Sequence, residues 1–197
     1  MAYNPQIHHR HSIRLKGYDY TREGAYFITV CVQDHVRLFG KIVNGEMRLN
    51  ESGKIVAETW DWLSTQYDYV KLDAMVVMPD HIHGIIIITD YPDNSCRVDS
   101  RIDTTILPRI DPTILPRIDP TTIKCKSIGH LIGAFKTVST KQINIYRNTP
   151  GMRIWQRNYY EHIIRNNLEL NRIRNYISNN IILFENNMNQ KNGKTQQ

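Results

Sequence analysis

The chain has 197 residues, a length that suits one domain with a sizeable core and is short for two. Lysine and arginine number 25 against 19 acidic residues, so the net charge is +6 and the isoelectric point is near 9.2. Three cysteines without C-x-x-C spacing argue against a disulfide or zinc-thiolate framework, and no apolar run is long enough to span a membrane. The amino terminus lacks the apolar stretch of a signal peptide, so we expect a cytoplasmic protein.

The positive charge is concentrated in an amino-terminal arm and in residues 141–174, a segment with seven basic and two acidic residues. A regional excess of this kind favours a polyanion, most often nucleic acid, although a merely solvated basic face is an alternative. The basic residues that we expect to contact DNA are Arg14, Lys16, Arg22, Arg153, Arg157, Arg165 and Arg172.

The first half of the chain alternates strand and helix patterns. Residues 25–32 are rich in β-branched and aromatic side chains and predict a strand. Asn44-Gly45 between two short alternating runs predicts a hairpin over 41–49. Apolar residues recur at helical spacing from 50 to 67, and two strands are predicted at 70–78 and 81–89 on either side of a Pro-Asp bend.

Residues 91–123 contain three copies of an eight-residue unit, each beginning Arg-Ile-Asp at residues 101, 109 and 117. Prolines spaced through the copies exclude a helix or a central strand. Three short copies are too few for a solenoid. We therefore expect an exposed insertion between two core elements, explained by a duplication into a tolerant loop.

The second half predicts a helix over 126–146, a strand over 152–164 and a last helix over 167–184 that Asn166 or Asn167 can cap. The polar tail 186–197 is expected to be disordered. The core elements then follow the β-α-β-β-α-β order of a ferredoxin-like fold, which is α+β with an antiparallel sheet and helices on one face, plus a terminal helix. We predict one domain over residues 1–185 with its core at 12–184.

His81-Ile82-His83 lies within the longest apolar run of the chain, from Ala74 to Ile88. Side chains alternate along a strand, so both imidazoles point to one face. The pair forms half of a metal site, while two hydrogen-bonded structural histidines are the alternative.

Tyr176 and Asn180 are four residues apart on the last helix and therefore share a face. A tyrosine hydroxyl and a neutral amide could lie against a metal held by His81 and His83. The two imidazoles and the Asn180 oxygen would make a nitrogen and oxygen site suited to Mg²⁺ or Mn²⁺. Tyr176 at the edge of a core is the alternative, and Tyr159 and Tyr160 are rival nucleophiles by composition.

Five blocks, in order, resemble the IS200-like transposases and, among them, the branch of REP-associated tyrosine transposases. The blocks are RLKGYDY at 14–20, AYFITV at 25–30, VVMPDHIHG at 76–84, WQRNYYEH at 155–162 and NYISNN at 175–180. The resemblance runs from about Ser12 to Phe184 and leaves out the insertion.

This resemblance implies a single-domain HUH endonuclease in which His81 and His83 bind the divalent metal and Tyr176 is the nucleophile. Asn180 takes the position of a polar third ligand, where relatives in the wider family have Gln. Cleavage of single-stranded DNA would leave a 5′-phosphotyrosine and a free 3′-hydroxyl, and the expected substrate is a short palindrome folded as a hairpin. His162 is a further family feature with an orienting, DNA-contacting or structural role. Trp155, Tyr159 or Tyr160 are available for base stacking.

Two other functions stay open at this point. One is a protein that binds hairpin DNA but has lost cleavage, and the other is a hydrolase that uses water as its nucleophile. Retention of His81, His83, Tyr176 and Asn180 together argues against simple decay. Whether the protein is a monomer or a homodimer is undecided from the sequence.

Overall fold

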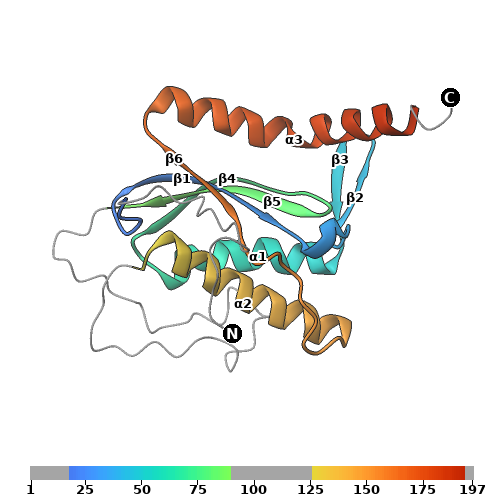
Figure 1. Ribbon diagram of the computed structural model, residues 1–197, viewed down its shortest axis with the longest axis horizontal. Helices are drawn as coiled ribbons and strands as arrows, with labels where there is room; N and C mark the ends of the chain where they lie inside the picture. The colour runs from blue at the N-terminus through green and yellow to red at the C-terminus, as the bar shows by residue number, and fades with distance from the viewer. Residues whose placement is uncertain (1–17, 90–125, 194–197) are drawn as a thin grey trace, which may run out of the picture.

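A four-stranded antiparallel sheet, in the order β4-β5-β1-β6, forms the centre of the computed structural model (Figure 1). The structure describes residues 18–89 and 126–193. The strands are β1 (Gly24–Cys31), β4 (Val70–Val77), β5 (His81–Ile88) and β6 (Tyr160–Ile164). The arm with Arg14 and Lys16, and the repeat insertion, lie outside the described residues.

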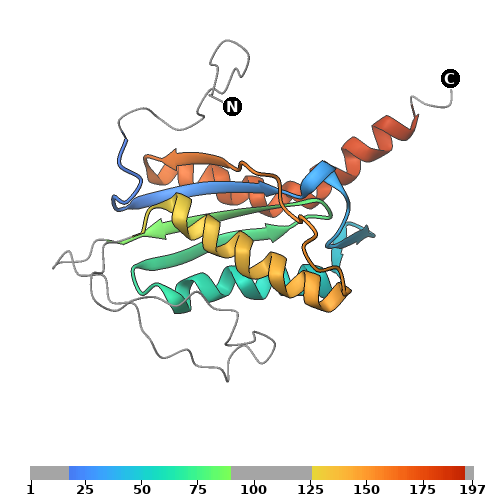
Figure 2. The same ribbon diagram turned by 60° about the horizontal axis from the view of Figure 1, so that its bottom comes forward.

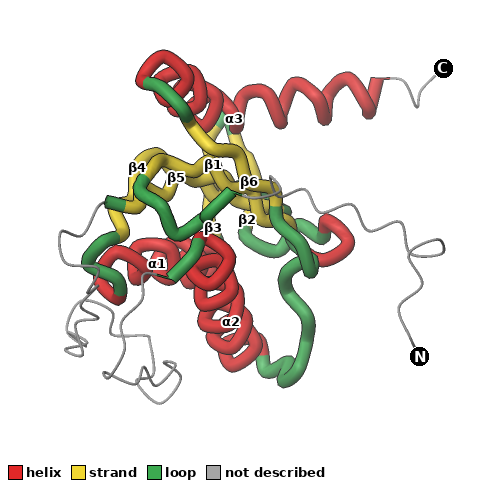
Figure 3. The backbone as a smooth tube through the Cα atoms, turned by 60° about the vertical axis from the view of Figure 1, so that its left-hand side comes forward, coloured by secondary structure: helices red, strands yellow, loops and turns green. Residues whose placement is uncertain are grey.

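Helices cover both faces of this sheet. Helices α1 (Glu51–Gln66) and α2 (Ile128–Arg147) pack on one face and α3 (Asn167–Gly193) lies across the other, as Figures 1 and 3 show. The order of strands and helices, and the strand order of the sheet, confirm the predicted ferredoxin-like arrangement with an added carboxy-terminal helix. A 3-10 turn, η1 (Gln33–His35), and the hairpin β2 (Gly40–Val43) and β3 (Glu46–Leu49) complete the fold.

The two covered faces explain the long apolar run of β5. Ile82 and Ile86 are fully buried in the larger core, between the sheet and helices α1 and α2. Ile85, on the opposite face, joins Phe27, Ile173 and Ile177 in a smaller core under α3. A strand buried on both sides reads as continuous rather than alternating hydrophobicity.

Local signals in the sequence place several element boundaries correctly. Asn50 accepts a hydrogen bond from the Gly53 amide (3.0 Å) and caps α1, and Asn166 accepts one from the Glu169 amide (2.8 Å) and caps α3. Asn44 and Gly45 both have positive φ, as a tight hairpin turn requires.

Two predicted boundaries are wrong. The strand expected over 152–164 begins only at Tyr160; before it, Trp155 makes a single bridge to Val32. The carbonyls of residues 156–158 accept from the Lys136 ammonium instead of pairing with a strand. Helix α3 continues to Gly193 rather than ending at 184, because no proline or glycine interrupts it before that residue. The segment from 186 therefore begins as helix rather than as a disordered tail.

No helix in residues 18–89 or 126–193 is both long and apolar enough to cross a membrane.

Candidate functional site

His81 and His83 lie on the face of β5 that is covered by α3, and they point toward each other. Their Nε2 atoms are 3.1 Å apart. His81 is partly buried and His83 is only 6% exposed. The sequence prediction of two imidazoles on one strand face is therefore realised in the structure. We refer to them as the histidine pair.

The far nitrogen of each imidazole has its own partner. His81 Nδ1 donates to the Asp80 carboxylate (2.6 Å), and His83 Nδ1 lies 2.8 Å from the Thr29 hydroxyl on the neighbouring strand β1. Burial raises the pKa of Asp80, but the hydrogen bond and charge of His81 outweigh it and hold that pKa below its usual range. An ionised carboxylate can only accept, so His81 carries a proton on Nδ1, while its Nε2 faces His83.

Burial, and to a smaller extent the charge of His81, lowers the pKa of His83 to about 3. His83 is therefore a neutral imidazole at neutral pH, which is the form that binds a metal.

The histidine pair suits a divalent cation. Two nitrogens bound at right angles to one ion, at about 2.1 Å each, are about 3.0 Å apart, close to the spacing seen here. A hydrogen bond from the second ring nitrogen to a carboxylate or hydroxyl is also the usual support of a ligating histidine. Across the described ranges, no group of three or more His, Cys, Asp or Glu side chains is arranged to hold an ion.

Helix α3 brings the predicted tyrosine to this pair. The Tyr176 hydroxyl lies 3.4 Å from His83 Nε2, and the ring of Phe184, two turns later, contacts that of His81 at 6.2 Å. Asn180 is one turn from each of these residues, and so lies on the side of α3 that faces the histidine pair. It is only 6% exposed, whereas Tyr176 is 42% exposed. The role of Asn180 as a third ligand stays a prediction.

An aromatic cluster continues from the histidine pair toward the strand β6. The Phe27 ring stacks on His83 with centroids 5.4 Å apart, and the rings of Tyr176 and Tyr160 meet it edge-on at 6.0 and 6.3 Å. Tyr160 faces Thr29 across the sheet and is 51% exposed. It forms the open end of the cluster.

Among the residues suggested for base stacking, Trp155 is a core residue. Its side chain is only 4% exposed, its indole N–H donates to the Ser139 hydroxyl (2.9 Å), and its ring packs on Phe39 and Phe135. The suggestion of Trp155 as a stacking surface is therefore wrong, because the tryptophan helps to anchor the connection before β6 in the larger core.

His162 lies on the same face of the sheet but is engaged elsewhere. Its Nε2 is 2.7 Å from a carboxylate oxygen of Glu169, whose other oxygen accepts from the Arg165 amide (2.9 Å). These bonds join β6 to the first turn of α3. A role in holding the start of α3 accounts for the observed contacts of His162.

The predicted basic residues fall into separate regions. Arg22 precedes β1 at the end of the sheet remote from His81, since Gly24 pairs with Ile88 and Cys31 with His81. Arg165 and Arg172 are exposed, one at the start of α3 and one a turn before Tyr176. Arg153 and Arg157 lie on the other side of the molecule, along α2.

Sequence reasoning did not identify Thr29, Phe27 or Phe184 as site residues. Thr29 and Phe27 join the site only through the pairing of β1 with β5, and no local pattern fixes that register. Asp80 was identified only as part of a bend, although its position directly before the histidine motif is a usable signal.

A scan against models of known protein families finds no match. An uncharacterized protein of Haemophilus influenzae is 39% identical over 183 residues, which cover 93% of this chain and 94% of that protein. The chain belongs to the same family as this protein. The family is thus shown by sequence over nearly the whole length.

A solved structure is similar in fold. The structure of a REP-associated tyrosine transposase bound to a REP hairpin aligns with a TM-score of 0.51 and 17% identity, over 87% of this chain and 74% of that one. At this identity the similarity shows a shared α+β fold. It agrees with the fold that the resemblance of the five sequence blocks implied.

Proposed function

We propose that this protein is a metal-dependent single-stranded DNA endonuclease and strand transferase. It would act at DNA hairpins through a 5′-phosphotyrosine formed on Tyr176, in DNA transposition, as the REP-associated tyrosine transposases do. The observation that carries the proposal is the Tyr176 hydroxyl 3.4 Å from the Nε2 of a neutral, buried His83 that is paired with His81. The fold shared with a hairpin-bound transposase supports it.

The proposed chemistry balances without an external energy source. The Tyr176 oxygen attacks the phosphorus, and its proton is released. The bond from phosphorus to the 3′-oxygen breaks, and that oxygen takes up a proton to become a free hydroxyl. Attack by another 3′-hydroxyl on the phosphotyrosine then rejoins DNA and returns the tyrosine.

His81, His83 and the Asn180 carbonyl oxygen would hold Mg²⁺ or Mn²⁺. When bound, the ion neutralises charge on the phosphoryl oxygens, and three neutral ligands leave its charge undiminished. The hydrogen bonds to Asp80 and Thr29 would support the two imidazoles as ligands. The rings of Phe27 and Phe184 pack beside the pair.

The test is a denaturing gel of 3′-labelled single-stranded DNA from the flanks of the gene, incubated with Mn²⁺. We expect labelled DNA to move with the wild-type protein and to be absent from Tyr176→Phe. Tyr146→Phe is the matched control, since Tyr146 is also exposed (58%) but lies on α2, and it should form the adduct normally.

Other results would favour the competing functions. Nicking by Tyr176→Phe at the wild-type rate would indicate a hydrolase with a water nucleophile. Tight hairpin binding without nicking or adduct in the wild type would indicate a silent DNA-binding protein.

A further inference from the structure

The 3-10 turn η1 lies against the bend that leads into the histidine pair. It follows β1 at the end of the sheet where β5 begins, and Figure 2 shows it beside the connection from α2 to β6. The Val32 amide donates to the Asp80 carbonyl (2.8 Å), and the amides of Leu38 and Phe39 donate to that of Pro79 (2.8 and 3.1 Å). The backbone on both sides of the turn is thus fixed to the bend directly before the two histidines.

Two successive residues of this turn have a left-handed backbone. Asp34 has a φ of 55° and His35 a φ of 53°. Residues other than glycine adopt this conformation rarely, although Asp and His tolerate it better than most, and such strain often occurs at functional sites. The Asp34 carboxylate accepts from the neighbouring Gln33 side-chain amide (2.8 Å), whereas the His35 ring reaches back to the bend. The turn therefore directs His35 at the residues that support the histidine pair.

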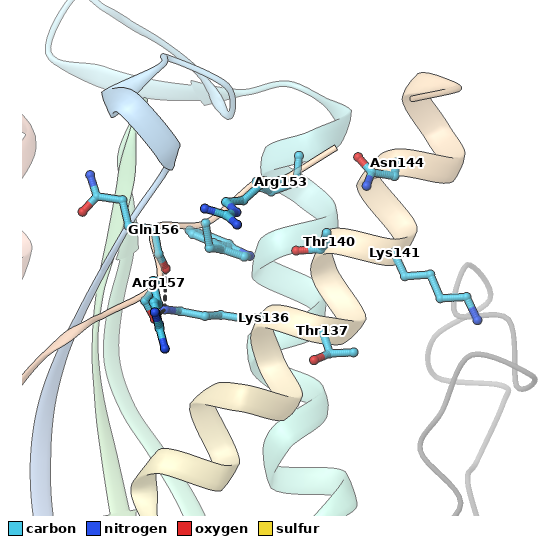
Figure 4. Close-up of a pocket in the computed structure, with 10 residues that line it drawn as sticks. Lys136, Thr137, Thr140, Lys141, Asn144, Arg153, Gln156 and Arg157 are labelled. Atoms are coloured by element: carbon cyan, nitrogen blue, oxygen red, sulfur yellow. Dashed lines mark hydrogen bonds between the residues drawn. The ribbon is translucent and has the colours of Figure 1, made fainter. Parts of the chain in front are cut away.

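The His35 ring lies between Asp80 and Gln156. Its Nδ1 is 3.8 Å from Asp80 Oδ2, and its Nε2 is 3.2 Å from the side-chain nitrogen of Gln156. Gln156 is itself fixed, because its amide donates to the Cys31 carbonyl (2.9 Å) and its carbonyl accepts from Lys136 (2.9 Å). Its side chain points away from α2 (Figure 4). An amide nitrogen can only donate, so His35 Nε2 accepts and the proton of the neutral ring is on Nδ1, which faces Asp80.

The Asp80 carboxylate has one oxygen for each of two histidines. Oδ1 accepts from His81 Nδ1 (2.6 Å), and Oδ2 faces His35. The last torsion of an aspartate side chain is loosely defined, so a carboxylate held at one oxygen can still rotate. Attraction at the second oxygen restricts that rotation, and with it the plane to which the His81 ring is bonded.

We propose that His35 is a positioning residue of the candidate metal site, which acts through Asp80 to hold His81 in its ligating orientation. The inference rests on the proposed function, in which the histidine pair binds a divalent cation. His35 contacts the carboxylate and is not itself a ligand. Its loss should therefore lower the affinity for metal while the fold is retained.

The test is titration calorimetry of the full chain with Mn²⁺, without DNA. His35→Gly removes the ring and suits the positive φ, so the variant should fold. We expect it to bind Mn²⁺ about three- to tenfold more weakly, less than the loss usual for a direct partner of a ligating histidine. His35→Asn should bind close to wild type, because the Asn amide nitrogen can take the position of Nδ1 and Asn also tolerates a positive φ.

Two variants serve as controls. His130→Ala removes another exposed histidine, at the start of α2, and Asp34→Gly changes the other left-handed residue of the turn. Both should leave Mn²⁺ binding unchanged. A second readout needs no metal: in nuclear magnetic resonance spectra of the histidine rings, the Nδ1 proton of His81 should be visible in wild type and His35→Asn, and broadened by exchange in His35→Gly.

The two readouts separate this inference from the proposed function. Unchanged Mn²⁺ affinity and an unchanged His81 ring signal in His35→Gly would overturn the role of His35, as would an affinity of His35→Asn as low as that of His35→Gly. A wild-type protein that does not bind Mn²⁺ would contradict the proposed metal site, and the ring spectra would still decide whether His35 orders His81.

Discussion

At the scale of single residues, Gly84 matters because it follows the histidine pair in β5 and points to the opposite face. A Cβ at this position would lie 2.9 Å from Trp60 Cε2 and closer still to Cζ2, and the Trp60 ring is fully buried against Phe135. The ring cannot yield without disturbing the larger core. The absence of a side chain at Gly84 thus lets the sheet and α1 pack closely behind the site.

We predict that Gly84→Ala destabilises the protein by about 1–3 kcal/mol, the usual cost of overpacking a core. Chemical denaturation followed by tryptophan fluorescence measures the change. Gly133→Ala is the control, because a Cβ there has no neighbour within 4 Å on helix α2. It should stabilise the protein by about 0.5–1 kcal/mol. If Gly84→Ala leaves the free energy of unfolding unchanged, Trp60 can move and the prediction is wrong.

The residues of the site divide into those that a local motif reveals and those that only the fold brings in. His81, His83, Tyr176 and Asn180 stand in short motifs whose spacing places them on one face of a strand or helix. Thr29 reaches His83 only because β1 and β5 pair in one register across 54 residues of sequence. Such a register depends on the whole sheet, so sequence patterns could not predict it.

At the scale of elements, the position of α3 decides whether Tyr176 meets the histidine pair. The small core under α3 is supplemented by a bidentate ion pair, in which Arg174 Nε and Nη2 donate to the two oxygens of Asp73 on β4 (2.8 and 2.5 Å). Arg174 is two residues before Tyr176. The ion pair therefore helps to hold the part of α3 that carries Tyr176 over the sheet.

We predict that Asp73→Asn increases hydrogen exchange of the α3 amides and slows adduct formation. The hydrogen bonds of Arg174 hold the pKa of Asp73 below its usual range, although burial acts the other way. Because the pKa of this carboxyl is lower in the folded than in the unfolded protein, the ionised carboxylate stabilises the fold above about pH 4. This stabilisation is lost as the pH falls through the pKa of the folded state. The melting temperatures of Asp73→Asn and wild type should therefore differ at pH 7, and the difference should shrink as the pH falls below about 4.

An exposed ion pair serves as the control for this prediction. Lys54→Met removes the partner of Glu51 on the surface of α1 and should change neither the exchange of α3 nor the pH dependence. A difference between Asp73→Asn and wild type that persists unchanged at pH 3 would contradict the assigned role of the ion pair.

Elements were predicted well where the signal is local and poorly where a distant side chain intervenes. Capping residues and helical periodicity were sufficient to predict α1, α2 and the start of α3. The segment before β6 resembles a strand in sequence. Its carbonyls at Gln156 and Asn158 instead accept hydrogen bonds from Lys136, about twenty residues earlier in the chain. Competition of this kind between a side chain and the sheet has no signature in the segment itself.

At the scale of the whole molecule, the two ends of the repeat insertion lie close together. Thr89 bonds to the Tyr69 carbonyl through both its amide and its hydroxyl, and the Lys126 amide donates to the Tyr69 hydroxyl (2.8 Å). The two ends of the insertion thus bond to opposite ends of the same buried residue, Tyr69. A short loop of ordinary length can connect them.

We predict that replacing residues 91–124 with a six-residue Gly-Ser linker leaves the melting temperature and the rate of adduct formation close to wild type. The four candidate site residues lie outside the deleted segment, and neither Thr89 nor Lys126 is removed. Thermal denaturation and the labelled-DNA gel measure the outcome. Loss of adduct in a folded, shortened protein would instead assign the repeats a part in DNA handling.

The central claim is that Tyr176 becomes covalently bound to DNA, and peptide mass spectrometry tests it most directly. Trypsin releases residues 175–191 with Tyr176 as the one tyrosine, and residues 158–165 with the rivals Tyr159 and Tyr160. After reaction with hairpin DNA and nuclease digestion, the 175–191 peptide should gain the mass of a nucleotide attached through its 5′-phosphate. The same mass on 158–165, or on no peptide from a protein that nicks DNA, would contradict the account.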